Sequence, residues 1–412
     1  MTAAQDPVRR VVWRAFWGSR LVVFLAGVVA VAQVGNQSVG AIYDPDRLTA
    51  PFGYFGNLLV SPFARWDSEW YLAVAKWGYG PQTSGVALNP PGGLPRMNFF
   101  PLYPLLIRIG GFVLRSDLVA GILISLVAFG IALALLYRLV ALDFTQEVAE
   151  VTVLLVAFCP MAFFFSAIYT ESLFLALSLG AIYLARRQRW VWAGVLGALA
   201  AATRVEGVLL VVPLAMLAWP QRRSLRWRAL ALALVPLGLL AYLSYLGIRY
   251  GQFTAPLRTQ SLFWMHRRTW PFGAAWKGAK LAWDGLRQLI LGPQHVPTLV
   301  PLYTGGPSFS ATQDIYNFLF LLLVAALFVY GLRRLPPAYS AYTLLSVAIP
   351  LSDPVVPSPL GSFPRYAMVA FPLFICAAQV VVKRRWNTPA VAAGAVLMGL
   401  FTAEFATWLW VG

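Results

Sequence analysis

The stretch from Arg65 to Tyr79 combines an acidic pair with three tryptophans and two tyrosines. If it is helical, the side chain of Asp67 shares one face with Trp70, Tyr71 and Val74, by the i, i+3, i+4, i+7 rule. Tryptophan and tyrosine prefer the membrane–water boundary. We therefore expect a helix that lies flat at a membrane surface and holds the Asp67 carboxylate at a fixed depth, where the remainder of the chain delivers a substrate to it.

Two other acids have both a site role and a simpler explanation. Glu69 lies on another face of the expected helix, toward Lys76, so it either serves the same site or pairs with that surface base. Glu171 follows Thr170 at the expected start of an apolar helix. It either complements the helix N-terminus, with Thr170 as the cap, or takes part in a site.

Two arginines fall within or beside apolar segments. Arg204 and Glu206 lie inside the apolar region 190–219, where ionisable side chains are costly and mark either a functional cavity or an internal ion pair. Arg365 precedes Tyr366 at the mouth of a later apolar segment, where its guanidinium either extends to the membrane boundary or clamps an anion. We favour a site role for both arginines.

Composition determines the class of protein that must position these side chains. Of the 412 residues, 59% are hydrophobic and 11% are charged, whereas soluble proteins are about one quarter charged. Apolar runs of about 20 residues recur along the chain, which predicts an all-α polytopic membrane protein with a single integral membrane domain over residues 1–412. The net charge of +17 comes mainly from short basic clusters between these runs. They indicate membrane orientation and anionic lipid as partners, and no nucleic acid.

The apolar runs predict about 11 transmembrane helices with a cytoplasmic N-terminus. A first outside loop, residues 35–116, would carry the surface helix, and a second large outside loop would cover residues 250–313. The region 190–219 has the pattern of two short helices that meet near Arg204. The expected spans are residues 11–34, 117–140, 150–168, 170–187, the two halves of 190–219, 227–249, 314–333, 338–351, 365–382 and 388–411.

Residues 98–114 leave an alternative topology open. If they cross the membrane, every later orientation is reversed and the basic clusters face outward. If they lie along the surface, or dip in and return, the clusters face inward, as the positive-inside rule favours. Arg108 and two prolines also weaken this segment as a span. The clusters are Arg186, Arg187 and Arg189; Arg222, Arg223, Arg226 and Arg228; Arg333 and Arg334; and Lys383, Arg384 and Arg385.

The second outside loop has many more bases than acids. Its one acid is Asp284, and it contains His266 beside Arg267. Long loops are less bound by the orientation rule, so the excess needs no special cause. Alternatively, the loop provides a pocket for a phosphate or pyrophosphate headgroup, which His266 and Arg267 would contact. The bases are Arg258, Arg267, Arg268, Lys277, Lys280 and Arg287.

Five motifs in this order resemble the PIG-V type of mannosyltransferase, from about residue 60 to residue 382. The first two, around Trp66–Asp67 and Phe99–Pro104, are the most specific. This family belongs to the GT-C class of membrane glycosyltransferases, whose eukaryotic PIG-V members add the second mannose to the GPI anchor. The motifs are Arg-Trp-Asp-Ser-x-Trp-Tyr, Phe-Phe-Pro-Leu-Tyr-Pro, Tyr-Thr-Glu-Ser-Leu-Phe, Ala-Thr-Arg-x-x-Gly and Pro-Arg-Tyr.

The resemblance implies a GT-C-like fold with surface helices and a catalytic acid in the first outside loop. Asp67 matches that acid and would be the general base. Relatives often carry a small or amide residue at the position of Glu206, so the resemblance implies no direct role for Glu206. The eukaryotic motif has histidine after the acid, where this chain has Glu69 and Trp70, so the GPI acceptor is not transferred to this chain. The residues that we expect to bind substrate are Glu69, Trp70, Tyr103, Glu171, Arg204, His266, Arg267, Arg365 and Tyr366.

The implied reaction moves a sugar, mannose in the family, from a polyprenyl-phosphate donor to a hydroxyl of a glycolipid or glycan acceptor. It would occur with inversion at the outer face of a bacterial plasma membrane. The scheme requires no metal or other cofactor, although GT-C enzymes differ in their use of a divalent metal. A transporter or flippase of a polyprenyl-linked lipid would also have basic outer loops and broken helices. It does not explain the surface helix or the one-sided clustering of acids and aromatic residues.

Overall fold

The computed structural model describes residues 7–35, 43–44, 46–80, 94–221, 226–292, 306–356 and 358–411. Helices form almost all of the described elements, with an isolated β-bridge between His266 and Val355. The predicted all-α fold is confirmed. The α-helices are α1 (Pro7–Val34), α3 (Tyr54–Val60), α4 (Ser68–Trp77), α5 (Leu102–Leu114), α6 (Asp117–Val140), α7 (Gln146–Ala157), α8 (Glu171–Arg186), α9 (Trp190–Ala201), α10 (Val211–Ala218), α12 (Leu237–Tyr250), α13 (Ala255–Leu262), α14 (Pro271–Leu291), α15 (Gly306–Gly331), α16 (Pro337–Ser352), α17 (Phe363–Ala367), α18 (Phe371–Arg384) and α19 (Asn387–Ala406).

Five described segments are long and apolar enough to cross a membrane: α1, α6, the segment Leu230–Tyr250, α15 and α19. Each remaining predicted span coincides with one or more shorter helices: α8 and α16 are single helices of 16 residues, and the others are interrupted. The span expected at 150–168 ends as an α-helix at Ala157 and continues in a 3₁₀ turn, Ala162–Phe165. Pro160 lies between the two and cannot donate the backbone hydrogen bond that a continuous helix needs.

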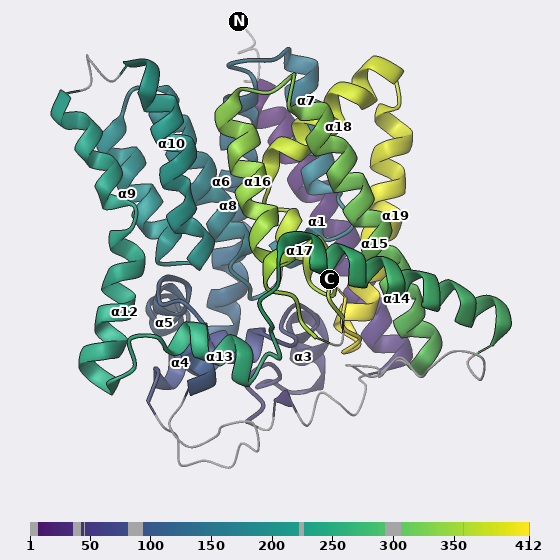
Figure 1. Ribbon diagram of the computed structural model, residues 1–412. Helices are drawn as coiled ribbons and strands as arrows, with labels where there is room; N and C mark the ends of the chain where they lie inside the picture. The colour runs from purple at the N-terminus through teal and green to yellow at the C-terminus, as the bar shows by residue number, and fades with distance from the viewer. Residues whose placement is uncertain are drawn as a thin grey trace, which may run out of the picture.

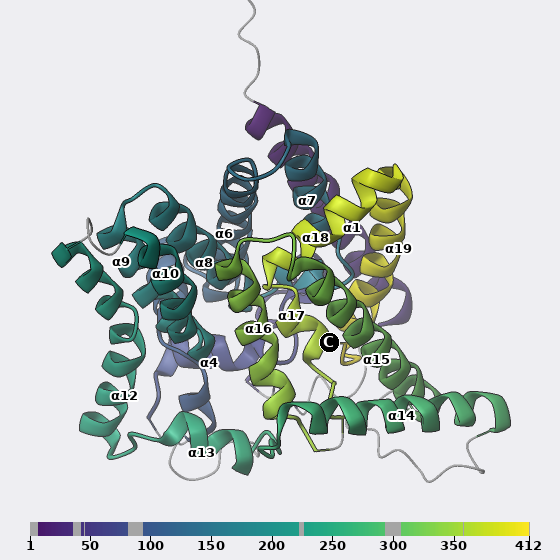
Figure 2. The same ribbon diagram turned by 45° about the horizontal axis from the view of Figure 1, so that its top comes forward.

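The α8–α9, α15–α16 and α18–α19 turns, which carry basic clusters, lie at one end of the bundle, where α1 also begins (Figure 1). Arg186, at the end of α8, forms an ion pair with Asp143 in the α6–α7 turn and contacts Tyr339 near the start of α16. Helices α3, α4, α13 and α14 lie toward the opposite end in both views (Figures 1 and 2). Two of the predicted cluster members, Arg222 and Arg223, lie outside the described residues.

Helix α5, which covers most of residues 98–114, is short. Its 13 residues span about 20 Å, less than the roughly 30 Å of a bilayer core. The amide of Leu102, at its start, donates to the carbonyl of Ala202 at the end of α9. Helix α6 begins three residues after α5 ends, and the two helices pack against each other. The length of α5 favours the alternative in which this segment does not cross a membrane.

Helix α4 is enclosed by protein and is not a helix that lies flat on the surface. Its residues from Ser68 to Ala75 are all buried. Trp70 stacks on Phe99, with 5.8 Å between ring centroids, and meets the edge of Trp264 at the same distance. The aromatic residues that we assigned to the lipid boundary therefore pack inside the protein, because α5 and the segment before it cover α4.

Candidate active site

The structure brings five charged side chains from four separate segments into one chain of ion pairs. Nη1 of Arg365 donates to Oδ2 of Asp67 at 2.9 Å, and its Nε lies 3.6 Å from Oε1 of Glu171. Nη1 of Arg204 donates to the same Glu171 oxygen at 2.9 Å, and its Nη2 donates to Oε1 of Glu206 at 3.2 Å. Three carboxylates thus alternate with two guanidinium groups, and the ionised chain has a net charge of −1. We call it the charge chain.

Asp67 is held by the backbone on both sides of it. Trp66 has a φ of +56°, a left-handed conformation that is unfavourable for a bulky residue. The hydroxyl of Tyr169 bridges this turn, because it accepts from the Asp67 amide at 3.1 Å and donates to the Arg65 carbonyl at 3.2 Å. Nε of Arg65 donates in turn to the carbonyl of Ala406 in α19. The result is a fixed Asp67 backbone at the N-terminus of α4.

Glu171 occupies the first position of α8, where the positive end of the helix dipole favours a carboxylate. The alternative explanation had Thr170 as its cap, but the Thr170 side chain makes no capping hydrogen bond. Its hydroxyl instead accepts from Nη1 of Arg204 at 3.4 Å and lies 3.4 Å from the hydroxyl of Tyr71. Glu171 therefore belongs to the charge chain as well as to the helix terminus.

Arg365 is enclosed by aromatic rings. It lies on the short helix α17, and its guanidinium carbon is 4.9 to 5.6 Å from the ring centroids of Phe164, Tyr169, Tyr366 and Trp410. Its Nη2 also donates to the Tyr366 hydroxyl at 3.1 Å. Aromatic faces stabilise a partly desolvated guanidinium, and two carboxylates neutralise it. This residue is an interior component of the protein, not a boundary residue that extends to the membrane surface.

The ends of the charge chain are more accessible than its centre. The side chain of Asp67 is 23% exposed and that of Glu206 is 15% exposed, whereas that of Glu171 is 1% exposed. The exposed surface of the charge chain is therefore at Asp67 on one end and at the Arg204–Glu206 pair on the other. Glu171 is the internal counter-ion that connects them.

Glu69 lies apart from the charge chain. It is buried, and it has no ion pair with Lys76 among the described contacts, so the expected surface pair is not formed. Burial and the neighbouring carboxylates of Asp44 and Asp46 raise the pKa of Glu69 to about 8, and Arg96 opposes the shift. This carboxyl group lies on the other side of α4 from the Asp67–Arg365 pair and has its own electrostatic environment.

Trp70, Tyr103 and Tyr366 differ in their relation to the charge chain. Tyr366 contacts it directly through Arg365, as described above. Tyr103 is fully buried and its hydroxyl bonds to the Gly121 carbonyl at 3.0 Å and to Oγ of Ser125 at 2.7 Å. Trp70 packs in the aromatic cluster beside α4. Trp70 and Tyr103 thus contact the protein interior.

His266 and Arg267 lie in a strand-like pairing between the segment that follows α13 and the segment that follows α16. The Arg267 amide donates to the carbonyl of Pro354, and the Val356 amide donates to the carbonyl of Met265. Nδ1 of His266 lies 3.7 Å from Oδ2 of Asp353. This pairing joins the segment after α13 to the segment that precedes Arg365. Its described contacts do not reach the charge chain.

Tyr169 contacts the backbone on both sides of Trp66, and the sequence did not single it out as part of the site. It occurs in the same motif as Glu171. The signal was its position, since a tyrosine two residues before a buried acid, within an apolar region, needs a partner for its hydroxyl.

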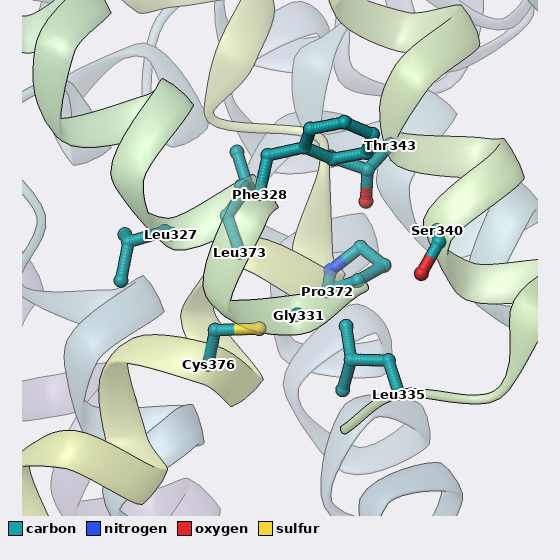
Figure 3. A pocket seen from close by; sticks show the side chains of 9 residues that line it. All are labelled: Leu327, Phe328, Gly331, Leu335, Ser340, Thr343, Pro372, Leu373 and Cys376. Atoms are coloured by element: carbon teal, nitrogen blue, oxygen red, sulfur yellow. The ribbon is translucent and has the colours of Figure 1, made fainter. Parts of the chain in front are cut away.

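A small crevice between α15, α16 and α18 lies elsewhere in the protein (Figure 3). Its empty volume, which includes open solvent at its mouth, is about 160 Å³, but it is too narrow to hold a water molecule, and no member of the charge chain lines it. Its lining residues are Leu327, Phe328, Gly331, Leu335, Ser340, Thr343, Pro372, Leu373 and Cys376. This crevice is a packing defect and not a candidate substrate site.

Comparisons with known proteins agree with this arrangement of motifs. The model of the mannosyltransferase (PIG-V) family matches residues 10–219, just over half of the chain, and these include Asp67, Glu171 and Arg204. No curated protein matches the chain. ArnT from Cupriavidus metallidurans, solved with bound undecaprenyl phosphate, is 14% identical with a TM-score of 0.40, and the match covers 84% of this chain and 72% of ArnT.

The oligosaccharyltransferase of Archaeoglobus fulgidus, solved with a tethered acceptor peptide, is 13% identical with a TM-score of 0.47. That match covers 97% of this chain but only 56% of the archaeal protein. The family match covers four of the five residues of the charge chain, all except Arg365, and helices long and apolar enough to cross a membrane accompany it. The chain therefore belongs to the mannosyltransferase (PIG-V) family and is a membrane glycosyltransferase.

Proposed function

We propose that this protein transfers a mannosyl residue from a polyprenyl-phosphate donor to the hydroxyl of a glycolipid or glycan acceptor. The observation that carries the proposal is the ion pair between Asp67 and Arg365. It places a partly exposed carboxylate beside a buried cation, although the two residues are 298 positions apart in the sequence. A sugar transfer from a phosphate needs a base for the acceptor and positive charge for the leaving group.

Asp67 would act as the general base. Arg365 donates to its Oδ2, so Oδ1 is the oxygen that would take the proton as the acceptor oxygen attacks the anomeric carbon. The bond between that carbon and the phosphate oxygen breaks, and the electron pair leaves with the polyprenyl phosphate. A phosphate leaves without a proton, so a second carboxylic acid, as glycoside hydrolysis needs, is not required. A single displacement inverts the anomeric carbon.

The two arginines of the charge chain would stabilise the leaving phosphate. A guanidinium group pairs with phosphate oxygens through two parallel hydrogen bonds. Arg204 lies at an accessible end of the charge chain, and Arg365 contacts the base itself. The same guanidinium that binds Asp67 can thus respond to the charge that develops on the donor.

The distribution of basic residues supports a site on the outer face. The start of α1 and the described basic turns lie at one end of the bundle (Figure 1). The positive-inside rule assigns that end to the cytoplasm. The helices of the first and second loops, which flank the charge chain, then belong to the outer side, where donor and acceptor would meet.

The substitution Asp67→Asn tests the proposal. A synthetic mannosyl-phosphoryl-polyprenol donor is incubated with the detergent-solubilised enzyme and a glycolipid extract, and labelled sugar in the product is counted. Loss of the base should lower kcat by about 10²- to 10⁴-fold without loss of the folded state. Asp284→Asn, at an exposed acid of α14, serves as the matched control and should retain activity.

Two results would contradict the proposal. Turnover by Asp67→Asn at the wild-type rate would show that another group takes the proton. Retention of the anomeric configuration in the product, measured by NMR, would exclude a single displacement. Transport of the lipid without sugar transfer would instead support a flippase.

A further inference from the structure

Glu206 occupies one side of the Arg204 guanidinium. Nε of Arg204 donates to Oε2 of Glu206 at 3.4 Å and Nη2 donates to Oε1 at 3.2 Å, which is the fork arrangement that guanidinium also uses for phosphate. Nη1 is committed to Glu171 and Thr170. Of the five N–H donors of this arginine, at most one is left for a ligand. A phosphate cannot pair with Arg204 in two places while Glu206 is there.

The carboxylates of Glu171 and Glu206 differ in how readily each could move away from the Arg204 guanidinium. Glu171 is almost fully buried, begins a helix and is shared with Arg365. Glu206 is more exposed, and its described ion pair is with Arg204 alone. It lies on a 3₁₀ turn, Val205–Leu210, between the two short helices α9 and α10. Glu206 is thus the carboxylate that a competing anion would displace.

The backbone beside Glu206 is fixed by close packing. A Cβ atom at Gly207 would lie 2.3 Å from the backbone of Ala200 and Ala201 in α9. The Gly207 amide also donates to the Arg204 carbonyl at 3.0 Å. Because the turn is packed against α9, movement of Glu206 must come from rotation of its side chain. Arg204 then keeps its place while its partner changes.

We propose, on the basis of the function proposed above, that the Glu206 side of Arg204 is the phosphate subsite for the lipid donor. The Glu206 carboxylate occupies this subsite until the phosphate displaces it. The exchange conserves charge, since a phosphodiester carries a charge of −1, as a carboxylate does. The charge chain therefore keeps its net charge when the donor binds. After transfer, the product is a phosphomonoester, and the return of Glu206 assists its release.

The substitution Glu206→Gln tests this subsite, because an amide keeps the shape of the side chain but competes weakly for a guanidinium. The probe is a fluorescent polyprenyl phosphate, whose binding to the full-length enzyme in detergent is titrated at equilibrium. Glu206→Gln should bind it about tenfold more tightly, as expected when a charged competitor is lost. The donor KM should fall by a similar factor. The polyprenyl alcohol, which lacks the phosphate, should bind both proteins equally.

Glu404→Gln is the matched control. Glu404 is a partly buried acid in α19 that accepts a hydrogen bond from Gln313, away from the charge chain, so its substitution should leave probe binding unchanged. Glu206→Asp keeps the charge but shortens its reach, and it should also tighten binding. This second variant remains informative if the amide variant folds poorly.

Unchanged or weaker binding of the phosphate by both Glu206 variants would overturn the subsite. The result is separable from a failure of the proposed reaction. If the wild-type enzyme transfers no sugar but the Glu206 variants bind the phosphate more tightly than it does, the proposed function fails and the subsite stands. If wild-type enzyme transfers sugar and the variants bind the phosphate no better, the subsite fails and the function stands.

Discussion

The Tyr169 hydroxyl offers a direct test of how the fold positions Asp67. Tyr169→Phe removes one oxygen and keeps the ring, which packs against Phe164 with 4.9 Å between centroids and lies 5.3 Å from the Arg365 guanidinium carbon. Two hydrogen bonds are lost, one from the Asp67 amide and one to the Arg65 carbonyl. These bonds span Trp66, whose left-handed backbone they hold in place.

The expected cost follows from these two bonds. A typical intramolecular hydrogen bond contributes about 0.5 to 1.5 kcal/mol net, and a buried group left without a partner costs about 1 to 3 kcal/mol. Tyr169→Phe should therefore lower the free energy of unfolding by about 1 to 3 kcal/mol. The strain at Trp66, of order 1 to 3 kcal/mol, would then drive the turn to relax. A displacement of about 1 Å at a catalytic group can cost up to a hundredfold in rate.

We expect kcat to fall by about 10- to 100-fold, while the donor KM changes little. The loss should be smaller than for Asp67→Asn, because Arg365 still binds the carboxylate. The assay is sugar transfer in detergent over a range of donor concentrations, together with thermal unfolding. Tyr242→Phe is the control, since the Tyr242 hydroxyl is also buried and donates to the Met97 carbonyl at 2.9 Å, away from Asp67.

The reasoning would be refuted if both tyrosine variants lost stability to the same extent and both retained wild-type kcat. Tyr169 would then support the fold without positioning the base. A raised donor KM with normal kcat would also refute it, because the lost contacts would then act on donor binding and not on Asp67.

Two further predictions concern charge. Arg365→Lys keeps the charge but cannot contact Asp67, Glu171 and the Tyr366 hydroxyl together, so kcat should fall by about a hundredfold in a protein that still folds; retained activity would show that charge alone suffices. For Glu69, the raised pKa of about 8 means that the folded state holds a proton that the unfolded state releases near its ordinary pKa. Stability should therefore be greatest below about pH 4.5 and fall with pH up to about 8, by at most about 1.4 kcal/mol per pH unit. Glu69→Gln should abolish that slope, and parallel melting-temperature profiles of the two proteins between pH 5 and 8 would contradict the assignment.

The helical class and most helix positions could be predicted from the sequence, because apolar runs between basic clusters determine where the chain can cross a membrane. The joint of two short helices at Arg204 could be predicted as well, since neither half of residues 190–219 is long enough to cross alone. The burial of α4 could not be predicted from the sequence. Its tryptophans fit a membrane boundary and a protein interior equally well, and only the covering segments decide between them.

The sequence singled out all five residues of the charge chain as candidates, together with others that lie apart from it, but their arrangement was not predictable. The Arg204–Glu206 pair is local, and two positions of separation already favour an ion pair. The Asp67–Arg365 pair joins the first loop to α17, and no local pattern encodes that contact. The motifs pointed to these residues because the family resemblance groups them. The physical reason that they lie together is that each ionised acid in the interior requires a cation.

Four of the five members of the charge chain, all except Asp67, lie at or beside breaks between helices. Glu171 begins α8 after the break in the preceding span, Arg204 separates α9 from its 3₁₀ turn, and Arg365 lies on α17, one short break before α18. The helices α1, α6, α15 and α19, which run uninterrupted, supply none of the five residues.

Non-helical backbone at membrane depth is tolerated only where protein or a water-filled cavity satisfies it. Arg20 of α1 illustrates this requirement, because its guanidinium donates to the carbonyls of Ala157 and Ala162, which flank the break after α7. The uninterrupted helices thus stabilise the breaks, and the breaks bring helix termini and charged side chains to one place. Substitution of Arg20 would then act on the site through the backbone at η3 (Ala162–Phe165), which precedes Tyr169 and Glu171. The interruptions that weaken the helices also supply partners for buried charges. The Asp67 carboxylate and the guanidinium groups of Arg204 and Arg365 are therefore tolerated in this apolar interior.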